Sequence, residues 1–282
     1  MVTKVISMEK VKRVRLDTYL TEHGFFESRA KSQAAIMAGQ VLADEQKIDK
    51  PGTAVKEGVS IRLLGDQLRY VSRGGLKLEK ALQVFPLDLA DKVCLDIGAS
   101  TGGFTDCMLQ NGAAKVFAVD VGYGQLAYKL RTDERVVCME KTNVRYLTRE
   151  QLGEEADFAS VDVSFISLKL VLPALYPLLK DEAELVCLVK PQFEAGREKV
   201  GKKGVVRDPA VHREVLEQVT AFAAGQHYTV LDLAYSPIKG PEGNIEYLMY
   251  LKKNNGEESG LPAGLDSVIG QLVAHSHEEL DR

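Results

Sequence analysis

Short apolar runs alternate with helical stretches from residue 93 onward, and this alternation limits the fold more than any other feature of the sequence. An apolar run at residues 93–97 precedes a glycine-rich turn and a helical stretch, and a second run spans residues 115–120. Parallel strands need such crossover helices, whereas antiparallel strands can be joined by tight turns. Further strands are expected at residues 135–139, 158–162, 184–190, 228–234 and 246–251. The sequence therefore predicts a doubly wound, mostly parallel, Rossmann-like α/β sheet with a ligand site at the carboxyl ends of its strands.

The turn after the first of these strands indicates which ligand the site holds. A dinucleotide-binding turn reads G-x-G-x-x-G, so that a pyrophosphate can rest on the helix N-terminus, but here the middle glycine is displaced. Asp96 stands two residues before Gly98, and an acidic side chain there disfavours pyrophosphate and suits the cationic methionine end of S-adenosylmethionine. Asp120 ends the second strand, where a carboxylate can accept both ribose hydroxyls of a nucleoside. The two acids favour a methyltransferase over a dehydrogenase.

Four charged residues are expected at this same edge of the sheet. Asp162 and Lys190 each end a predicted strand. Glu246 opens the last strand, whose beginning lies at that edge if the strand is antiparallel. Lys77 lies in the segment before the first strand and could reach the edge from the approach side. We therefore expect two amines and two carboxylates to converge beside the ligand.

This set of four suits methyl transfer to a ribose hydroxyl, which is a weak nucleophile and needs a proton acceptor beside it. Our hypothesis is that Lys190 accepts or orients the proton and that Lys77 stabilises the developing alkoxide. Asp162 and Glu246 would hold the two lysines in place. Burial and a neighbouring cation lower a lysine pKa, whereas nearby carboxylates raise it, so the sequence leaves this balance open.

The N-terminal segment has a different pattern and forms a module of its own. Leu16 begins a helical spacing that Gly24 closes, Ser28 is a plausible N-cap of a second helix, and short alternating strands follow up to residue 63. The strings RLDTYL, SRAKSQAAIMAGQVLAD and KPGTAVKEG resemble the S4 RNA-binding domain. That resemblance implies phosphate contacts, which dock a protein without choosing a sequence, by the basic residues Arg13, Arg15, Arg29 and Lys31.

The charge distribution agrees with an RNA-binding N-terminus. Residues 1–80 hold 15 Lys and Arg against 10 Asp and Glu, a net charge of +5, whereas the rest of the chain has a net charge of −9. Long-range attraction to phosphate is therefore expected to act on the N-terminal part.

Longer strings extend the resemblance to most of the chain. YVSRGGLKLEKAL, CLDIGASTGGFTDC, AVDVGYGQLAYKL, DVSFISLKLVLPAL, LVKPQFEAGRE and SPIKGPEGNIEYL are similar to the TlyA family, which joins an S4 domain to a catalytic domain similar to the FtsJ ribose methyltransferases. The resemblance implies S-adenosylmethionine-dependent 2′-O-methylation of cytidine in ribosomal RNA, within the ribosome or a subunit. It implies the catalytic set Lys77, Asp162, Lys190 and Glu246. With Asp96, the expected cofactor site comprises Gly98, Ala99, Ser100, Thr101, Gly102, Asp120, Val121 and Asn143.

We divide the chain into an S4 domain at residues 1–64, a linker at 65–71, a methyltransferase domain at 72–253 and an acidic tail at 254–282. The four cysteines form no C-x-x-C pair and are expected to be reduced. No signal peptide or membrane-spanning run is evident, which favours a cytoplasmic protein. No histidine stands in a metal-ligand spacing, so we expect no catalytic metal, and the sequence indicates no oligomeric state.

Two other function classes stay open at this point. Some members of the resembling family were first called hemolysins, which suggests a membrane-active protein. Its only support is a weak apolar face in the tail, where a net negative charge favours packing or disorder instead. The second alternative is a non-catalytic RNA-binding protein that retains the fold, against which the complete set of four charged residues argues.

Overall fold

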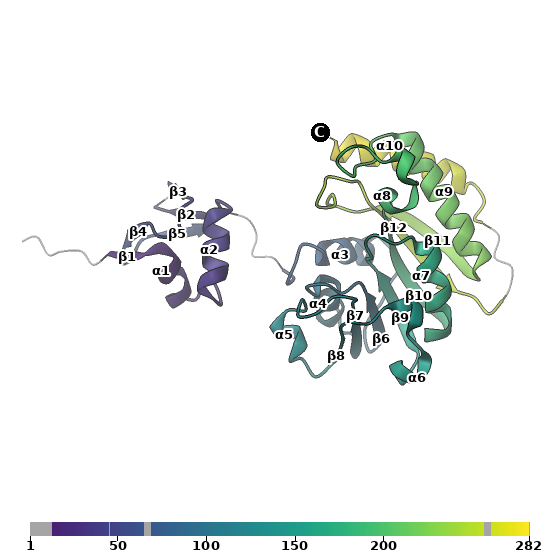
Figure 1. The fold of residues 1–282 in the computed structure, drawn as a ribbon, viewed down its shortest axis with the longest axis horizontal. Coiled ribbons are helices and arrows are strands. Elements are labelled where there is room, and N and C mark those ends of the chain that lie inside the picture. Colours follow the sequence, from purple (N-terminus) through teal and green to yellow (C-terminus); the bar gives the residue numbers. More distant parts are fainter. Residues whose placement is uncertain (1–12, 45, 65–68, 257–260, 282) are drawn as a thin grey trace, which may run out of the picture. The chain divides into compact units, whose positions relative to one another are not determined.

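The computed structural model describes residues 13–44, 46–64, 69–256 and 261–281, which divide into two compact units at the junction of Arg69 and Tyr70. Figure 1 shows the two units, which are described separately below. Residues 65–68 of the expected linker lie outside the described residues. Tyr70 and Val71, which we assigned to that linker, pack in the second unit: the Tyr70 side chain is buried and the Val71 amide donates to Asp106 at 2.8 Å.

The first unit packs two helices against short antiparallel strands. Helix α1 (Leu16–Glu22) and helix α2 (Arg29–Met37) follow the predicted order, and the Ser28 side chain caps α2 as expected by accepting from the Lys31 amide. Three strands form one sheet in the order β3 (Gln46–Ile48), β2 (Val41–Ala43), β5 (Ile61–Leu63). A separate pair joins β1 (Arg13–Arg15) to β4 (Ala54–Lys56). The sequence did not predict β1, because its partner lies about 40 residues away.

The second unit is built on a seven-stranded sheet with the order β11-β12-β10-β9-β6-β7-β8. Strand β12 runs antiparallel to both of its neighbours, and the remaining neighbours are parallel. This confirms the mostly parallel α/β sheet with an antiparallel last strand. The strands are β6 (Val93–Ile97), β7 (Lys115–Val119), β8 (Val136–Met139), β9 (Ala156–Val161), β10 (Leu179–Val189), β11 (Tyr228–Tyr235) and β12 (Tyr247–Lys253).

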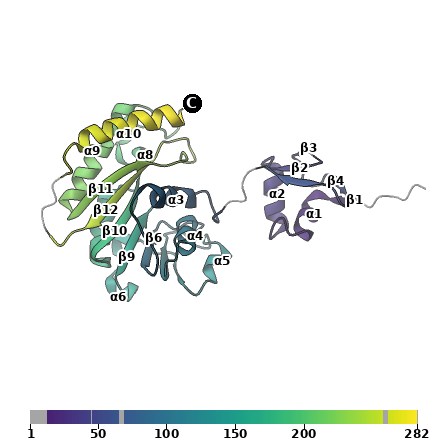
Figure 2. The same cartoon turned by 180° about the vertical axis from the view of Figure 1, so that it is seen from behind.

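Helices cover both faces of this sheet, and Figures 1 and 2 show α3 and α4 on one side and α7 and α9 on the other. Successive side chains of a strand point to opposite faces, so both faces of a covered sheet must be apolar. In β6, Cys94 packs in the core below α3 and α4, whereas Leu95 packs in the core below α7 and α9. The helices are α3 (Gly75–Val84), α4 (Gly103–Gln110), α5 (Tyr128–Arg131), α6 (Arg149–Leu152), α7 (Leu168–Leu175), α8 (Pro191–Glu194) and α9 (Pro209–Gly225).

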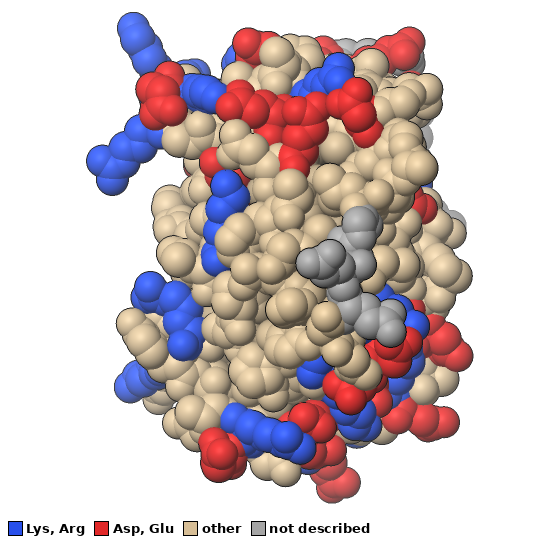
Figure 3. Space-filling model, turned by 90° about the vertical axis from the view of Figure 1, so that its right-hand side faces the viewer, with Lys and Arg blue, Asp and Glu red and all other residues tan. Residues whose placement is uncertain are grey.

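Much of the segment that we treated as an acidic tail is a packed helix, α10 (Leu265–Leu280). Leu265, Ile269 and Val273 are buried in the same core as α7 and α9, so most of the apolar face considered for a membrane-active protein is covered. Acidic side chains gather at the top of Figure 3, at the height of α10 in Figure 1. Among the described residues, no helix combines the length and apolar character needed to cross a bilayer.

Candidate active site

The second unit has a large cavity at the carboxyl edge of its sheet, where a doubly wound fold is expected to bind ligands. Its volume is ≈ 1210 Å³. Gly98 follows β6, Asp120 follows β7 and Asp162 follows β9, and all three line the cavity. Gln192 in α8 lines it after β10. The segment after each of these four strands thus contributes one glycine or polar residue to the wall of the cavity.

The four charged residues that we expected to converge are in direct contact. Lys77 Nζ donates to Glu246 Oε2 at 2.7 Å and to Asp162 Oδ2 at 3.3 Å. Lys190 Nζ lies 2.5 Å from the other Asp162 oxygen, Oδ1. The antiparallel register pairs Val189 with Tyr247, and this places the end of β10 beside the beginning of β12. The predicted direction of the last strand is therefore what brings Glu246 to the cluster.

The cluster is buried, and its charges balance. The side chains of Lys77, Lys190 and Glu246 are 9%, 8% and 1% exposed. Burial lowers the pKa of Lys77, but the carboxylates of Asp162 and Glu246 outweigh burial and raise that pKa above the ordinary lysine value. Burial likewise raises the pKa of Asp162, and the two ammonium groups overcome it and lower that pKa. The balance of these effects thus favours the charged form of Lys77.

Two further polar residues touch the cluster and were not singled out from the sequence. Lys190 Nζ donates to Ser164 Oγ at 3.3 Å, and Gln192 Nε2 donates to Glu246 Oε1 at 3.5 Å. The other amide atom, Gln192 Oε1, is buried without a hydrogen-bond partner among the described residues. Such an acceptor is costly unless a ligand or a water supplies a donor. Both residues lie within two positions of a predicted strand end, and that nearness was the available signal.

An aromatic pair forms part of the cavity wall. The ring centroids of Phe165 and Phe193 are 5.1 Å apart, and both residues line the cavity. Phe165 has φ 63° and is 91% exposed, a costly state for a large apolar side chain. An exposed aromatic ring beside a polar cluster can accept a stacked base.

Five of the nine expected cofactor residues line the cavity: Gly98, Ser100, Asp120, Val121 and Asn143. Gly98 has φ 85°, and a Cβ there would overlap the carbonyl oxygen of Asp162. Asp120 is fixed by two backbone amides, since Oδ2 accepts from Ser100 and Oδ1 from Gly122, each at 2.7 Å. Gly98, Asp120 and Asp162 of the charged cluster therefore line the same cavity.

The position of Asp96 corrects one expectation. Its carboxylate is fully buried beneath the turn instead of facing the cavity, and it accepts from Thr105 N at 2.8 Å, Thr105 Oγ1 at 2.6 Å and Ser160 Oγ at 3.2 Å. Burial raises the pKa of Asp96 to about 6, against the lowering effect of these hydrogen bonds. Asp96 thus ties β6 to the start of α4 and does not contact a ligand of the cavity directly.

The other three expected cofactor residues shape the turn and are absent from the described cavity wall. The buried Ala99 donates its amide to Val119 O, and Thr101 O accepts from the Ala127 amide. Gly102 has φ 95° at the N-cap of α4, where a side chain would overlap Leu130.

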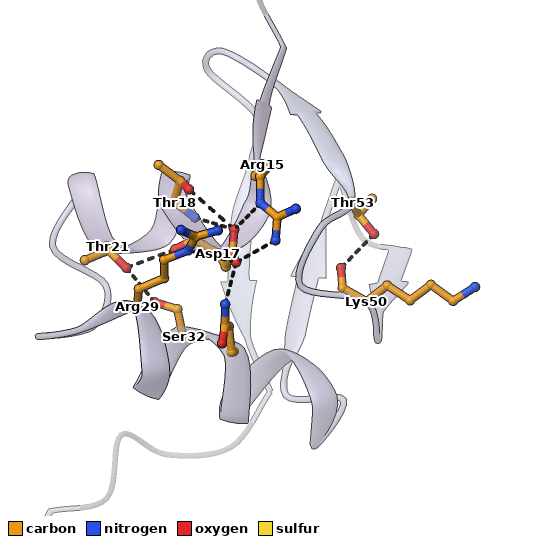
Figure 4. Close-up of polar contacts among 9 residues, drawn as sticks. Arg15, Asp17, Thr18, Thr21, Arg29, Ser32, Lys50 and Thr53 are labelled. Atoms are coloured by element: carbon orange, nitrogen blue, oxygen red, sulfur yellow. Dashed lines mark hydrogen bonds and ion pairs between the residues drawn. The ribbon is translucent and has the colours of Figure 1, made fainter.

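In the first unit, two of the four expected RNA-binding residues come together. Arg15 and Arg29 both donate to the buried carboxylate of Asp17, as Figure 4 shows. Their side chains stay 52% and 54% exposed. Arg13 is exposed on β1, and Lys31 on α2 forms an ion pair with Glu27.

Both units have counterparts among known proteins. The model of FtsJ-like methyltransferases matches residues 70–253, and the S4 domain model matches residues 14–61. The 16S/23S rRNA (cytidine-2′-O)-methyltransferase TlyA of Mycobacterium tuberculosis is 45% identical over 265 residues, 93% of this chain and 98% of that protein. Hemolysin A of Brachyspira hyodysenteriae is 42% identical over 238 residues, 84% of this chain and 99% of that protein. A solved structure named "Putative hemolysin from Streptococcus thermophilus" is 48% identical with a TM-score of 0.75, covering 96% of this chain and 98% of that chain.

Proposed function

The chain belongs to the TlyA family, in which an S4 domain precedes an FtsJ-like methyltransferase domain, and we propose that it methylates the ribose 2′-hydroxyl of a cytidine in ribosomal RNA. The observation that carries the proposal is the contact of Lys77 and Lys190 with Asp162 beside a cavity of ≈ 1210 Å³. The names of the relatives support the substrate, and we place the protein in the cytoplasm, where ribosomal RNA is found.

The cavity fits S-adenosylmethionine as the methyl donor. Gly98 lets the turn lie close against the Asp162 carbonyl beside the cavity, and Asp120 offers a fixed carboxylate suited to ribose hydroxyls. Ser100, Val121 and Asn143 complete the side of the cavity that would hold the nucleoside. When bound, S-adenosylmethionine supplies an electrophilic methyl group. The protein's own task is then to align the accepting oxygen and to manage its proton.

The two lysines divide that task according to their partners. Lys77 is paired with two carboxylates and has a raised pKa, so it stays protonated and can stabilise negative charge on the 2′-oxygen. Lys190 is paired with one carboxylate. As a neutral amine it would accept the hydroxyl proton, and as an ammonium it would donate to the 2′-oxygen and so orient the hydroxyl. Asp162 and Glu246 act as positioning residues for the two amines.

The S4 domain would dock the enzyme on RNA. Arg15 and Arg29, with Arg13 and Lys31 nearby in the sequence, would contact phosphates and leave the choice of nucleotide to the catalytic domain. Because phosphate contacts give a salt-dependent affinity, Arg15→Ala with Arg29→Ala should weaken RNA binding at moderate salt and leave cofactor affinity intact. Equal losses of both affinities would contradict this division of labour.

The direct experiment is to incubate the full chain with ribosomal RNA or subunits and labelled S-adenosylmethionine and to map 2′-O-methyl marks. An absence of new marks on subunits and free RNA alike would overturn the proposed function. The roles of the two amines are tested by Lys190→Arg against Lys77→Arg, because arginine keeps its charge but does not release its proton. We expect Lys190→Arg to slow transfer about 10²-fold or more and Lys77→Arg to retain more activity.

A further inference from the structure

A stretch of basic residues leads away from the cavity and is not used by the proposed reaction. We call residues 199–207 the basic loop; it connects the turn Arg197–Lys199 to α9. Lys199 already forms an ion pair, because its Nζ donates to both carboxylate oxygens of Glu214, at 2.6 and 2.7 Å. Lys202, Lys203 and Arg207 are exposed and make no hydrogen bond or ion pair with any residue that the structure describes. Three positive charges are therefore open to a ligand.

The backbone of the basic loop is held in place from beneath by buried polar side chains. Asn244, 2% exposed, donates to Gly204 O at 2.9 Å and accepts from Val206 N at 3.0 Å. His212, fully buried, contacts Val206 O at 3.0 Å through Nε2. Because a carbonyl oxygen can only accept, Nε2 carries the hydrogen. The cations thus extend from a fixed backbone.

The basic loop continues the wall of the cavity. Gly196, Arg197 and Val200 line the cavity itself, while Lys199, Lys202, Lys203 and Arg207 surround a neighbouring hollow of ≈ 340 Å³. Asn244, which holds the loop, is two residues from Glu246 of the charged cluster. Yet residues 81–282 carry a net charge of −9, which repels a polyanion. An RNA strand that enters the cavity therefore needs cations close to the entrance, and this loop supplies them.

We propose that the basic loop binds the phosphate backbone of the substrate RNA beside the nucleotide that enters the cavity. This proposal rests on the proposed function and adds to it a second RNA contact, on the catalytic unit itself. In this proposal the S4 domain docks the enzyme on the RNA, and the basic loop holds the RNA strand beside the cavity of the catalytic unit.

The test compares two triple variants with the same change in net charge. Lys202→Ala, Lys203→Ala and Arg207→Ala remove the loop cations. Lys115→Ala, Arg149→Ala and Lys180→Ala remove three cations whose side chains are 38%, 62% and 47% exposed. Lys115 begins β7, Lys180 is near the beginning of β10, and Arg149 lies in α6 before β9, all towards the amino edge of the sheet. Binding of a ribosomal RNA fragment is measured by fluorescence anisotropy across a range of salt, with cofactor affinity from calorimetry.

We expect the loop variant to bind RNA about tenfold more weakly near 0.1 M salt, and its log-log salt slope to fall by about 2, since each phosphate contact contributes about 0.7 to 0.9. Cofactor affinity should not change, and the amino-edge variant should bind RNA nearly as the parent does. Equal RNA binding by the two triple variants would overturn the proposal. A parent protein that binds RNA but transfers no methyl group would refute the proposed function and leave this binding test intact.

An independent observation concerns Asp17 in the first unit. Its fully buried carboxylate accepts from Arg15 Nε and Nη2 at 3.1 and 2.9 Å, Arg29 Nε at 3.0 Å and Gln33 Nε2 at 2.8 Å. The arginine partners lower its pKa far below the usual range, against the effect of burial. Gly52 leaves room for the Arg15 guanidinium, whose Nη1 would lie 3.0 Å from a Cβ there. Two flexible side chains are thus fixed side by side (Figure 4).

We infer that Asp17 is a positioning residue for RNA binding, because it holds both guanidinium groups where their outer nitrogens can meet one stretch of phosphates. Charge alone predicts the opposite effect, since a carboxylate repels RNA. Asp17→Asn therefore distinguishes the two effects by the direction of the change in RNA affinity. Loss of a repelling charge predicts tighter RNA binding, whereas loss of positioning predicts weaker RNA binding.

We expect Asp17→Asn in the full chain to bind the RNA fragment about fivefold more weakly, with unchanged cofactor affinity. Glu22→Gln is the matched control, because it removes one exposed carboxylate from the same helix, and it should bind as tightly as the parent or slightly more tightly. If Asp17→Asn does not fold, Gln33→Ala removes a hydrogen bond to Asp17 without a change of charge and should also weaken binding. Unchanged or tighter binding by the folded variant would overturn the inference.

Discussion

Replacing Asp162 with Asn tests whether the charged cluster works as one unit. Asp162 gives one oxygen to each lysine, at 2.5 Å to Lys190 and 3.3 Å to Lys77. In the variant Lys77 keeps its ion pair with Glu246, whereas Lys190 keeps no carboxylate among its described partners, only the hydroxyl of Ser164 and the ring of Phe193. An asparagine has nearly the same shape, so the change is one of charge.

The size of the effect follows from burial. The Lys190 side chain is 8% exposed, and a buried charge that loses its partner typically costs about 3 to 5 kcal/mol. The pKa of Asp162 is lowered in the folded state. The ionised carboxylate therefore stabilises the fold at any pH above the ordinary carboxyl pKa of 3.8, and this stabilisation is lost as the pH falls through the lower pKa of the folded state. The loss in the free energy of unfolding that Asp162→Asn causes should therefore be complete near neutral pH.

Asp157→Asn is the matched control, because Asp157 lies in the same strand β9 but at its amino end. Its ion pair with Lys180, at 2.7 Å, is partly exposed, and exposed pairs contribute at most about 1 kcal/mol. Asp157 also accepts from the Val93 amide at 3.0 Å, a bond that the asparagine oxygen can keep. Calorimetry of the full chain measures the unfolding of the second unit, and transfer of labelled methyl groups to ribosomal RNA measures the rate. We expect a rate loss of about 10²- to 10⁴-fold for Asp162→Asn and little loss for the control. Similar stability and rate in the two variants would refute the reasoning.

Three further predictions concern single features of the second unit. Gly98→Ala should abolish cofactor binding in a calorimetric titration, because its Cβ would overlap the Asp162 carbonyl, whereas Gly153→Ala has a similar positive φ but open space and should bind normally. Because the pKa of Lys77 is raised in the folded state, its charged form stabilises the fold fully below the ordinary pKa of 10.5, and this stabilisation is lost as the pH rises through the higher pKa of the folded state. Lys77→Met should therefore reduce the decline in the free energy of unfolding at alkaline pH. Ile269→Ala in α10 should cost about 2 to 5 kcal/mol in a denaturant titration, whereas Val268→Ala, at a position 44% exposed, should cost far less.

The sequence predicted the convergence of the charged cluster because topology alone places strand ends. Asp162 and Lys190 follow parallel strands, and an antiparallel β12 begins at the same edge, so no side-chain detail was needed. The direction of the Asp96 side chain could not be obtained in this way. It depends on Thr105 and Ser160, which come from a helix and a neighbouring strand, and a glycine-turn motif does not specify either contact.

Long-range pairing and burial account for the other differences. Strand β1 exists because β4 lies beside it, and three residues carry too little pattern to predict a strand. Helix α10 carries acidic residues on its exposed side, and its apolar residues are recognised as core residues only once they pack against α9 and β11. Gln192 gave no separate signal, because an amide becomes notable only when one of its atoms is buried without a partner.

The hydrogen bond between Lys77 and Glu246 joins residues that are 169 positions apart. During synthesis, one of these residues emerges from the ribosome long before the other. Strand β12 must also insert between β10 and β11, so the sheet stays unfinished until nearly the whole chain has been made. A nascent or prematurely terminated polypeptide therefore lacks the complete cluster, and any activity that depends on the cluster appears only after translation of the chain is almost over.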